Sequence, residues 1–66
     1  MSDMEDIKNL SIWMIKTVCN QPAMVKEGVD WDWVAAEAWH SYPGILNEFL
    51  INDAIDFIFE AAEYEQ

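Results

Sequence analysis

Apolar residues recur at intervals of three and four along most of this chain, and this spacing most restricts the folds that it can adopt. Near the beginning, Ile7, Leu10, Met14 and Val18 follow it. Such intervals place side chains on one face of an α-helix. Alternation with a period of two is absent, as are turn dipeptides such as Asn-Gly, which would indicate β-hairpins. The sequence therefore predicts an all-α fold.

Three segments carry the helical pattern, and proline and glycine residues separate them. We predict helices over about three ranges: 3–19, 31–41 and 44–63. Pro22 follows the first of these because its ring cannot continue the hydrogen-bond ladder of a helix. The segment 22–28 is either a short helical turn that Gly28 ends or an irregular connection. The expected architecture is a small three-helix bundle, with or without a short extra helical turn near residues 22–28, in a single domain over residues 1–66.

Helix starts and core positions can be predicted from the same pattern. Ser2 and Glu5 form the S-x-x-E signature of a capping box, in which each side chain satisfies a free backbone N–H group. Asp30 is the N-cap candidate of the second helix. In the second and third helices, the apolar residues predicted to face the core are Trp31, Val34, Ala35, Ala38, Trp39, Leu46, Phe49, Leu50, Ala54, Phe57, Ile58 and Ala61.

A chain of 66 residues has few means of stabilisation. A domain of this size buries only about 60% of its unfolded surface. Cys19 is the only cysteine, so an internal disulfide is excluded, and a lone thiol favours a reducing compartment. Packing of the aromatic residues, four of them tryptophan, or self-association must therefore supply the remaining stability.

The N-terminal segment and the apolar runs bear on location. A secretory signal begins with positive charge, whereas Asp3, Glu5 and Asp6 begin this chain. No uninterrupted apolar run approaches the roughly 18 residues of a membrane span. We therefore expect a soluble, cytoplasmic protein that does not bind membranes.

The charge of the chain restricts its partners. Thirteen carboxylates, three lysines and no arginine give a formal charge of −10. Direct binding to DNA or RNA phosphates needs a basic face, so nucleic acid is excluded as a direct partner. The hydrophobic fraction of 53% is too high for a disordered acidic tail. The sequence indicates a folded acidic domain.

Residues that carry catalysis or bind metals are scarce. Cys19 and His40 are the only residues of their types, and we expect a buried cysteine and a histidine near a helix C-terminus rather than a nucleophile and its base. A zinc site needs about four suitable ligands. Asp30-x-Asp32 lacks the glycine and glutamate that follow in a calcium loop. We expect no catalytic residues, no metal site and no cofactor.

Acidic residues gather on one face of the third predicted helix. The acidic stripe consists of residues at intervals of four, four, four and three, with Asp53 beside them: Glu48, Asn52, Asp56, Glu60 and Glu63. No lysine or arginine follows Gly28, although like charges one turn apart destabilise an isolated helix by roughly 0.2–0.5 kcal/mol per pair. One interpretation is a solvated face that keeps the protein soluble. The other is a surface for a basic partner, because carboxylates roughly 5–6 Å apart repeat on a scale comparable with DNA phosphates.

A second candidate surface lies at the second predicted helix. It combines the carboxylates of Asp30, Asp32 and Glu37 with Trp31 and Trp33. Tryptophan beside aspartate is a favourable combination for an interface. The two tryptophans cannot share one helix face, so one of them should be exposed or be buried against a partner or against the 22–28 segment. A helix packed between its two neighbours explains the same residues.

In length, acidity and lack of catalytic residues, the chain is similar to the small inhibitors that bacteriophages make against host proteins. Anti-CRISPR proteins, anti-restriction proteins and other DNA mimics belong to this group, and the likeness is one of composition that covers no motif. The function we expect is that of a small acidic inhibitor that binds and blocks a basic, nucleic-acid-handling protein, in the host cytoplasm if a phage encodes it. The residues expected to bind are Glu48, Asp53, Asp56, Glu60, Glu63, Asp30, Asp32, Glu37, Trp31 and Trp33.

The alternative is a homo-oligomeric assembly or adaptor protein that binds through apolar helix faces. The first and third predicted helices both carry apolar arcs wider than a three-helix core requires. A homodimer would bury the excess. Salt distinguishes the two, because binding through the acidic stripe should weaken as salt rises whereas apolar association should persist.

Overall fold

The computed structural model describes residues 3–64 of the chain, and the side chains of residues 3–62. Over these residues the secondary structure consists of four helices: α1 (Met4–Cys19), α2 (Pro22–Glu27), α3 (Trp31–Ser41) and α4 (Glu48–Tyr64). The predicted all-α fold is confirmed, with three principal helices and the short extra helix near residues 22–28.

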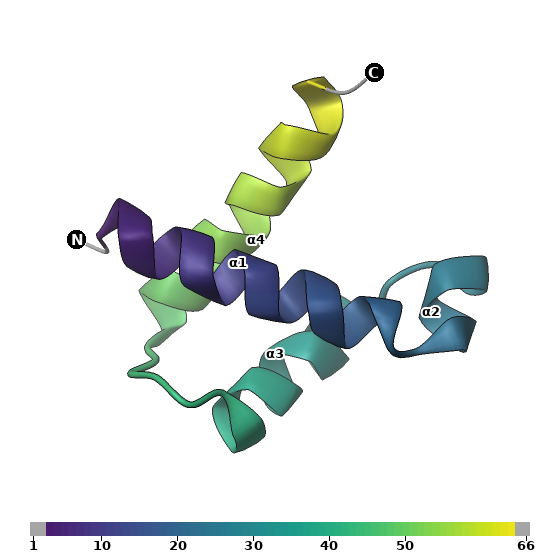
Figure 1. The fold of residues 1–66 in the computed structure, drawn as a ribbon, viewed down its shortest axis with the longest axis horizontal. Coiled ribbons are helices and arrows are strands. Elements are labelled where there is room, and N and C mark those ends of the chain that lie inside the picture. The colour runs from purple at the N-terminus through teal and green to yellow at the C-terminus, as the bar shows by residue number, and fades with distance from the viewer. Residues whose placement is uncertain (1–2, 65–66) are drawn as a thin grey trace.

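The helices form two thin layers. α1 runs across α3 and α4, α2 follows at the C-terminal end of α1, and the second half of α4 extends beyond α1 (Figure 1). The Cα atoms span 33 × 29 × 15 Å. Because the molecule is so thin, its interior is little more than the layer of side chains where α1 meets its neighbours.

The core is correspondingly small. Its buried hydrophobic residues come from the three principal helices: Leu10, Met14, Val34, Ala38, Leu50, Ile51 and Ala54. Ser11 is the buried polar residue among the described side chains, and its hydroxyl lies 2.7 Å from the Ile7 carbonyl and 3.3 Å from the Ala54 carbonyl. Small residues at this crossing let the backbones of α1 and α4 approach closely.

The N-terminal caps of α1 and α3 differ in how well they agree with the sequence prediction. Asp3 is the N-cap residue of α1, and its side chain makes no capping hydrogen bond. The predicted capping box begins at Ser2, which lies outside the described residues. At α3, the Asp30 carboxylate accepts a hydrogen bond of 3.1 Å from the Trp33 N–H group, as its N-cap position predicts.

The start of α4 was predicted four residues too early. The helix begins at Glu48, not near Gly44, because the Asn47 side chain caps it by accepting a 2.8 Å hydrogen bond from the Leu50 N–H group. Before the helix, the Tyr42 ring folds close to Gly44, where an added Cβ would lie 2.7 Å from the ring. The same ring meets Trp13 edge to face at 5.6 Å, which anchors the connection to α1.

Three residues predicted to face the core are exposed: Trp39, Phe49 and Ala61. Val34 and Ala38 are fully buried on α3, and Trp39 lies about 100° around the helix from Ala38. On α4, Phe49 is rotated by the same angle from the buried Leu50. Ala61 lies in the second half of α4, which extends beyond α1 (Figure 1).

Candidate protein-binding surface

The acidic stripe is a solvent-exposed face of α4. Asp53, beside the stripe, is exposed. The described members of the stripe itself are also all exposed: Glu48, Asn52, Asp56 and Glu60. Glu63 continues the spacing within α4, but its side chain lies outside the described residues. Burial of Leu50, Ile51 and Ala54 turns the opposite face of the helix toward the core. This packing is what directs the carboxylates outward.

Phe49 lies within this acidic face and is 78% exposed. Asp53 and Asp56 follow it at four and seven residues, so all three lie along one edge of α4. Sequence reasoning missed Phe49 because spacing of three and four also fits a register in which it faces the core. Its position directly before the Leu50–Ile51 pair was the available signal, since a helix cannot bury three consecutive residues on one face.

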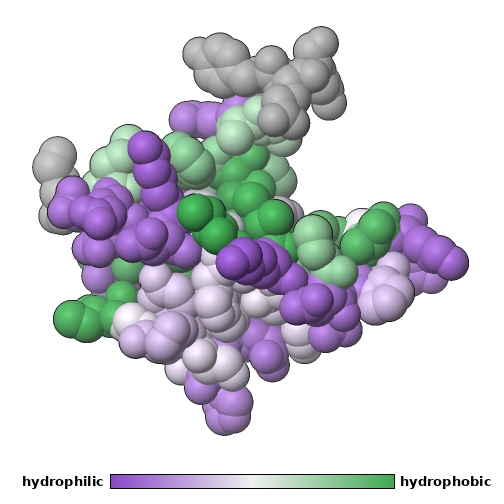
Figure 2. All heavy atoms as spheres, in the orientation of Figure 1, coloured by the Kyte–Doolittle hydropathy of each residue, from purple (hydrophilic) through white to green (hydrophobic). Residues whose placement is uncertain are grey.

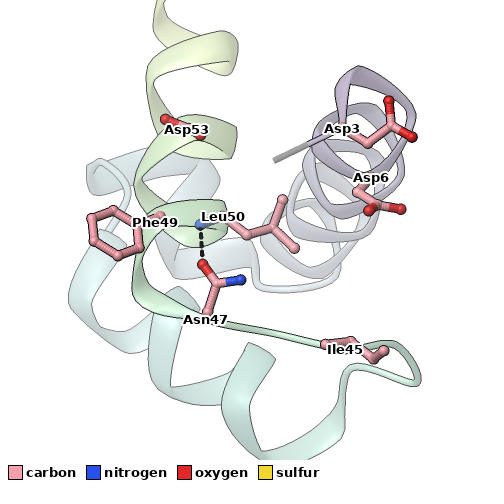
Figure 3. A pocket seen from close by; sticks show the side chains of 7 residues that line it. All are labelled: Asp3, Asp6, Ile45, Asn47, Phe49, Leu50 and Asp53. Atoms are coloured by element: carbon pink, nitrogen blue, oxygen red, sulfur yellow. Dashed lines mark hydrogen bonds between the residues drawn. The ribbon is translucent and has the colours of Figure 1, made fainter. Parts of the chain in front are cut away.

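A groove of about 590 Å³ opens between the first turns of α1 and α4 (Figure 3). Its lining combines three carboxylates with apolar side chains and one amide: Asp3, Asp6, Asp53, Ile45, Phe49, Leu50 and Asn47. Ile45, in the segment before α4, is 90% exposed. The sequence did not predict this groove or the presence of Asp3, Asp6 and Ile45 in its lining, because the groove forms between segments at least 39 residues apart.

The side chains around the groove diverge. Leu50 reaches from α4 toward α1, whereas Phe49 and Asp53 project from α4 on the side away from α1 (Figure 3). Asp3 and Asp6 point outward from the first turn of α1. The carboxylates therefore stand at the rim and do not converge on one point, as metal or acid–base chemistry would require. An apolar base with an anionic rim suits a lysine or arginine side chain, which has an aliphatic stem and a cationic head.

The second candidate cluster is not a single surface. The Asp30 carboxylate is engaged in capping α3, Asp32 is exposed in the first turn, and Glu37 is half-buried. Asp32 and Glu37 are five residues apart, which places them about 140° apart around the helix. We therefore assign Asp30 a structural role and find no shared face for the other two.

Both tryptophans of that cluster are half-buried. Trp31 meets Phe59 of α4 edge to face, with ring centroids 5.4 Å apart, and Trp33 packs against the core. The mostly exposed tryptophan is instead Trp39, at 55%. Which side of α3 is covered depends on where α1 and α4 lie, and local spacing does not reveal this.

Cys19 and His40, the single cysteine and the single histidine, lie near the C-terminal ends of two different helices. Cys19, expected to be buried, is exposed at the end of α1, and His40 is exposed in the last turn of α3 as the sequence indicated. Within residues 3–64, no group of three histidine, cysteine or acidic side chains could hold a metal ion. Over the same part of the chain, no helix is long and apolar enough to cross a membrane.

Comparison with known proteins returns no relative. No protein-family model matches the chain, and no curated protein or solved structure matches it.

Proposed function

We propose that this protein is a small acidic inhibitor that binds a basic, nucleic-acid-handling protein through the outer face of α4. The observation that carries the proposal is the exposed Phe49 beside Asp53 and Asp56. Burial of a phenylalanine side chain is worth about 1.5–3 kcal/mol. A face that served solubility alone would place a polar residue here.

The proposed contact has two parts. Phe49, with Ile45 beside the groove, supplies the apolar anchor that protein interfaces commonly have near their centre. The carboxylates of the acidic stripe pair with lysines or arginines of the partner, in the place of phosphates. Because ten net negative charges attract such a partner over long range, association should be fast and sensitive to salt.

The proposed inhibitor acts in the cytoplasm and belongs to the DNA-mimic class of inhibitors. A target that handles nucleic acid lies in the cytoplasm of a bacterial cell, which fits a chain with a single thiol. Inhibitors of the DNA-mimic type, such as anti-CRISPR and anti-restriction proteins, are the class with this combination of size and acidity. For a chain that a phage encodes, the compartment is the host cytoplasm.

A capture experiment tests the proposal. The purified protein is immobilised and exposed to nuclease-treated bacterial lysate at low and at high salt, and bound proteins are identified by mass spectrometry. We expect one nucleic-acid enzyme or regulator at low salt, lost at high salt. The variant Asp56→Lys/Glu60→Lys should lose it.

A matched control separates the stripe from total charge. Gln21→Lys/Ala23→Lys/Glu27→Lys makes the same change in net charge at three exposed positions in and beside α2. Circular dichroism should show equal helicity for both variants. If the control loses the target as fully as the stripe variant does, total charge and not the stripe carries binding.

A second candidate function, self-assembly through apolar helix faces, is favoured by α1. Ile12 and Ile15 are 53% and 46% exposed on the outer side of this helix. This surface is distinct from the acidic stripe, because Phe49 and Asp53 project on the side of α4 away from α1 (Figure 3). A dimer could thus present two acidic stripes at once.

A further inference from the structure

The outer face of α1 is uncovered along its length. Met4, Ile12, Ile15 and Cys19 are exposed there, and Lys8 shares the same face at helical spacing. Figure 2 shows hydrophobic side chains gathered over the middle of α1 and the adjoining second half of α4. A helix that packed only against α3 and α4 would carry polar residues on this side.

The second half of α4 continues this apolar surface. It extends beyond α1 (Figure 1), where Phe57 and Ile58 are half-buried and Ala61 is exposed. α1 therefore lies beside an apolar surface of α4, here called the apolar shelf, which consists of Phe57, Ile58 and Ala61. Another helix laid on that shelf, alongside α1, would cover Ile12 and Ile15 together with Ile58.

The charges of α1 are arranged with opposite signs at its two ends. Glu5 and Asp6 lie in the first turn and Lys16 lies in the last. Glu5 and Lys16 are eleven residues apart, or about three helical turns and ~16 Å, so they lie on the same edge of the helix. An antiparallel copy of α1 has its lysine where this edge has its glutamate.

We infer that two copies of this protein associate through the outer face of α1, antiparallel and about a two-fold axis that crosses this face midway between Glu5 and Lys16. In this arrangement Glu5 of each protomer faces the partner's Lys16, and the two Ile12 side chains meet close to the axis. Each α1 also covers the apolar shelf on the partner's α4. The contact is isologous, so one complementary pattern is used twice.

The charge pattern favours a second copy over another occupant. The lysines of the chain, Lys8, Lys16 and Lys26, all lie on α1 and α2, whereas the described face of α4 opposite the core is acidic. A basic partner would be drawn to α4 and not to the face of α1 that carries Lys8 and Lys16. The alternating ends of α1 are complementary to α1 itself. A dimer would also add apolar burial to a core of small size.

The test uses purified protein alone and measures the dissociation constant of the dimer by sedimentation equilibrium. This inference rests on the second candidate function, self-assembly, and not on the basic partner. Glu5→Lys and Lys16→Glu should each weaken the dimer by about tenfold, because each replaces two attractive contacts with repulsive ones. The double variant Glu5→Lys/Lys16→Glu restores both pairs and should return to within about threefold of the original.

A substitution at the axis gives an independent readout. Ile12→Asp should abolish the dimer while leaving helicity intact, since this side chain is exposed in the monomer. The matched control is Ile45→Asp, an exposed isoleucine outside this face, which should leave the dimer unchanged. A dimer that survives Ile12→Asp, or a double charge variant that stays weak, would overturn this interface but leave self-assembly standing. A protein that stays monomeric at millimolar concentration would overturn both.

Discussion

Ser11 of α1 and Ala54 of α4 meet at the crossing of the two helices, where the Ser11 hydroxyl lies 3.3 Å from the Ala54 carbonyl oxygen. Both residues are buried. The hydroxyl also lies 2.7 Å from the Ile7 carbonyl within its own helix. A small polar residue thus brings together the two helices that pack most extensively, and this crossing determines the side of α4 that is left to solvent.

Ser11→Leu should destabilise the protein by about 1–3 kcal/mol, because the larger side chain forces α1 away from α4. Ser11→Ala is the control. It keeps the close approach and loses only the hydrogen bond, so it should cost about 1 kcal/mol or less. Urea unfolding followed by circular dichroism measures both. Equal losses would mean that the hydrogen bond, and not the spacing, matters at this crossing.

Asn47→Ala should destabilise the protein by about 1 kcal/mol through loss of the side-chain cap on the Leu50 N–H group. Asn47→Asp retains an acceptor oxygen at the same place and should stay close to the original stability. Thermal unfolding of the two variants distinguishes them. If alanine is tolerated as well as aspartate, the cap contributes nothing and the start of α4 is fixed by packing alone.

The contrast between α3 and α4 explains how far the sequence could be used to predict the fold. The limits of α3 agree with the predicted range, because Asp30 caps its start and the Tyr42–Pro43 pair lies at its end. For α4, Pro43 and Gly44 suggested the start, yet the chain stays outside the helix until Asn47 caps it. The sequence showed which residues can start or end a helix. It did not show whether α4 starts after Pro43 and Gly44 or after Asn47.

The candidate site was less predictable than the fold. The acidic stripe follows from helical spacing alone, and its described members are exposed as that spacing implies. The side of α4 that Phe49 faces depends on where α1 crosses it, which is a contact between residues 43 apart in sequence at Ser11 and Ala54. The same long-range choice leaves Trp39 exposed on α3. The local sequence around Phe49 and Trp39 does not show how the helices pack against one another.

Asp30→Asn should leave stability within about 0.5 kcal/mol of the original, because asparagine caps a helix as well as aspartate does. Asp30→Ala should lose about 1 kcal/mol by removing the acceptor for the Trp33 N–H group. Chemical denaturation gives both values. Because Asp30→Asn keeps the cap and removes only the charge of residue 30, it tests that charge alone. Unchanged capture of the basic target would exclude the Asp30 charge from the interface.

Phe49→Ala should separate binding from folding. With 78% of its surface already exposed, this side chain contributes little to the core, so the free energy of unfolding should change by less than about 0.5 kcal/mol. As the apolar anchor of the proposed interface, its loss should weaken binding to the captured target by at least about tenfold. Isothermal titration calorimetry with that target measures the effect. The matched control is Trp39→Ala, which removes an exposed aromatic side chain of α3 outside the acidic stripe and should leave binding unchanged. If Phe49→Ala binds normally while Asp56→Lys/Glu60→Lys does not, charge alone carries the contact and Phe49 is not its apolar anchor.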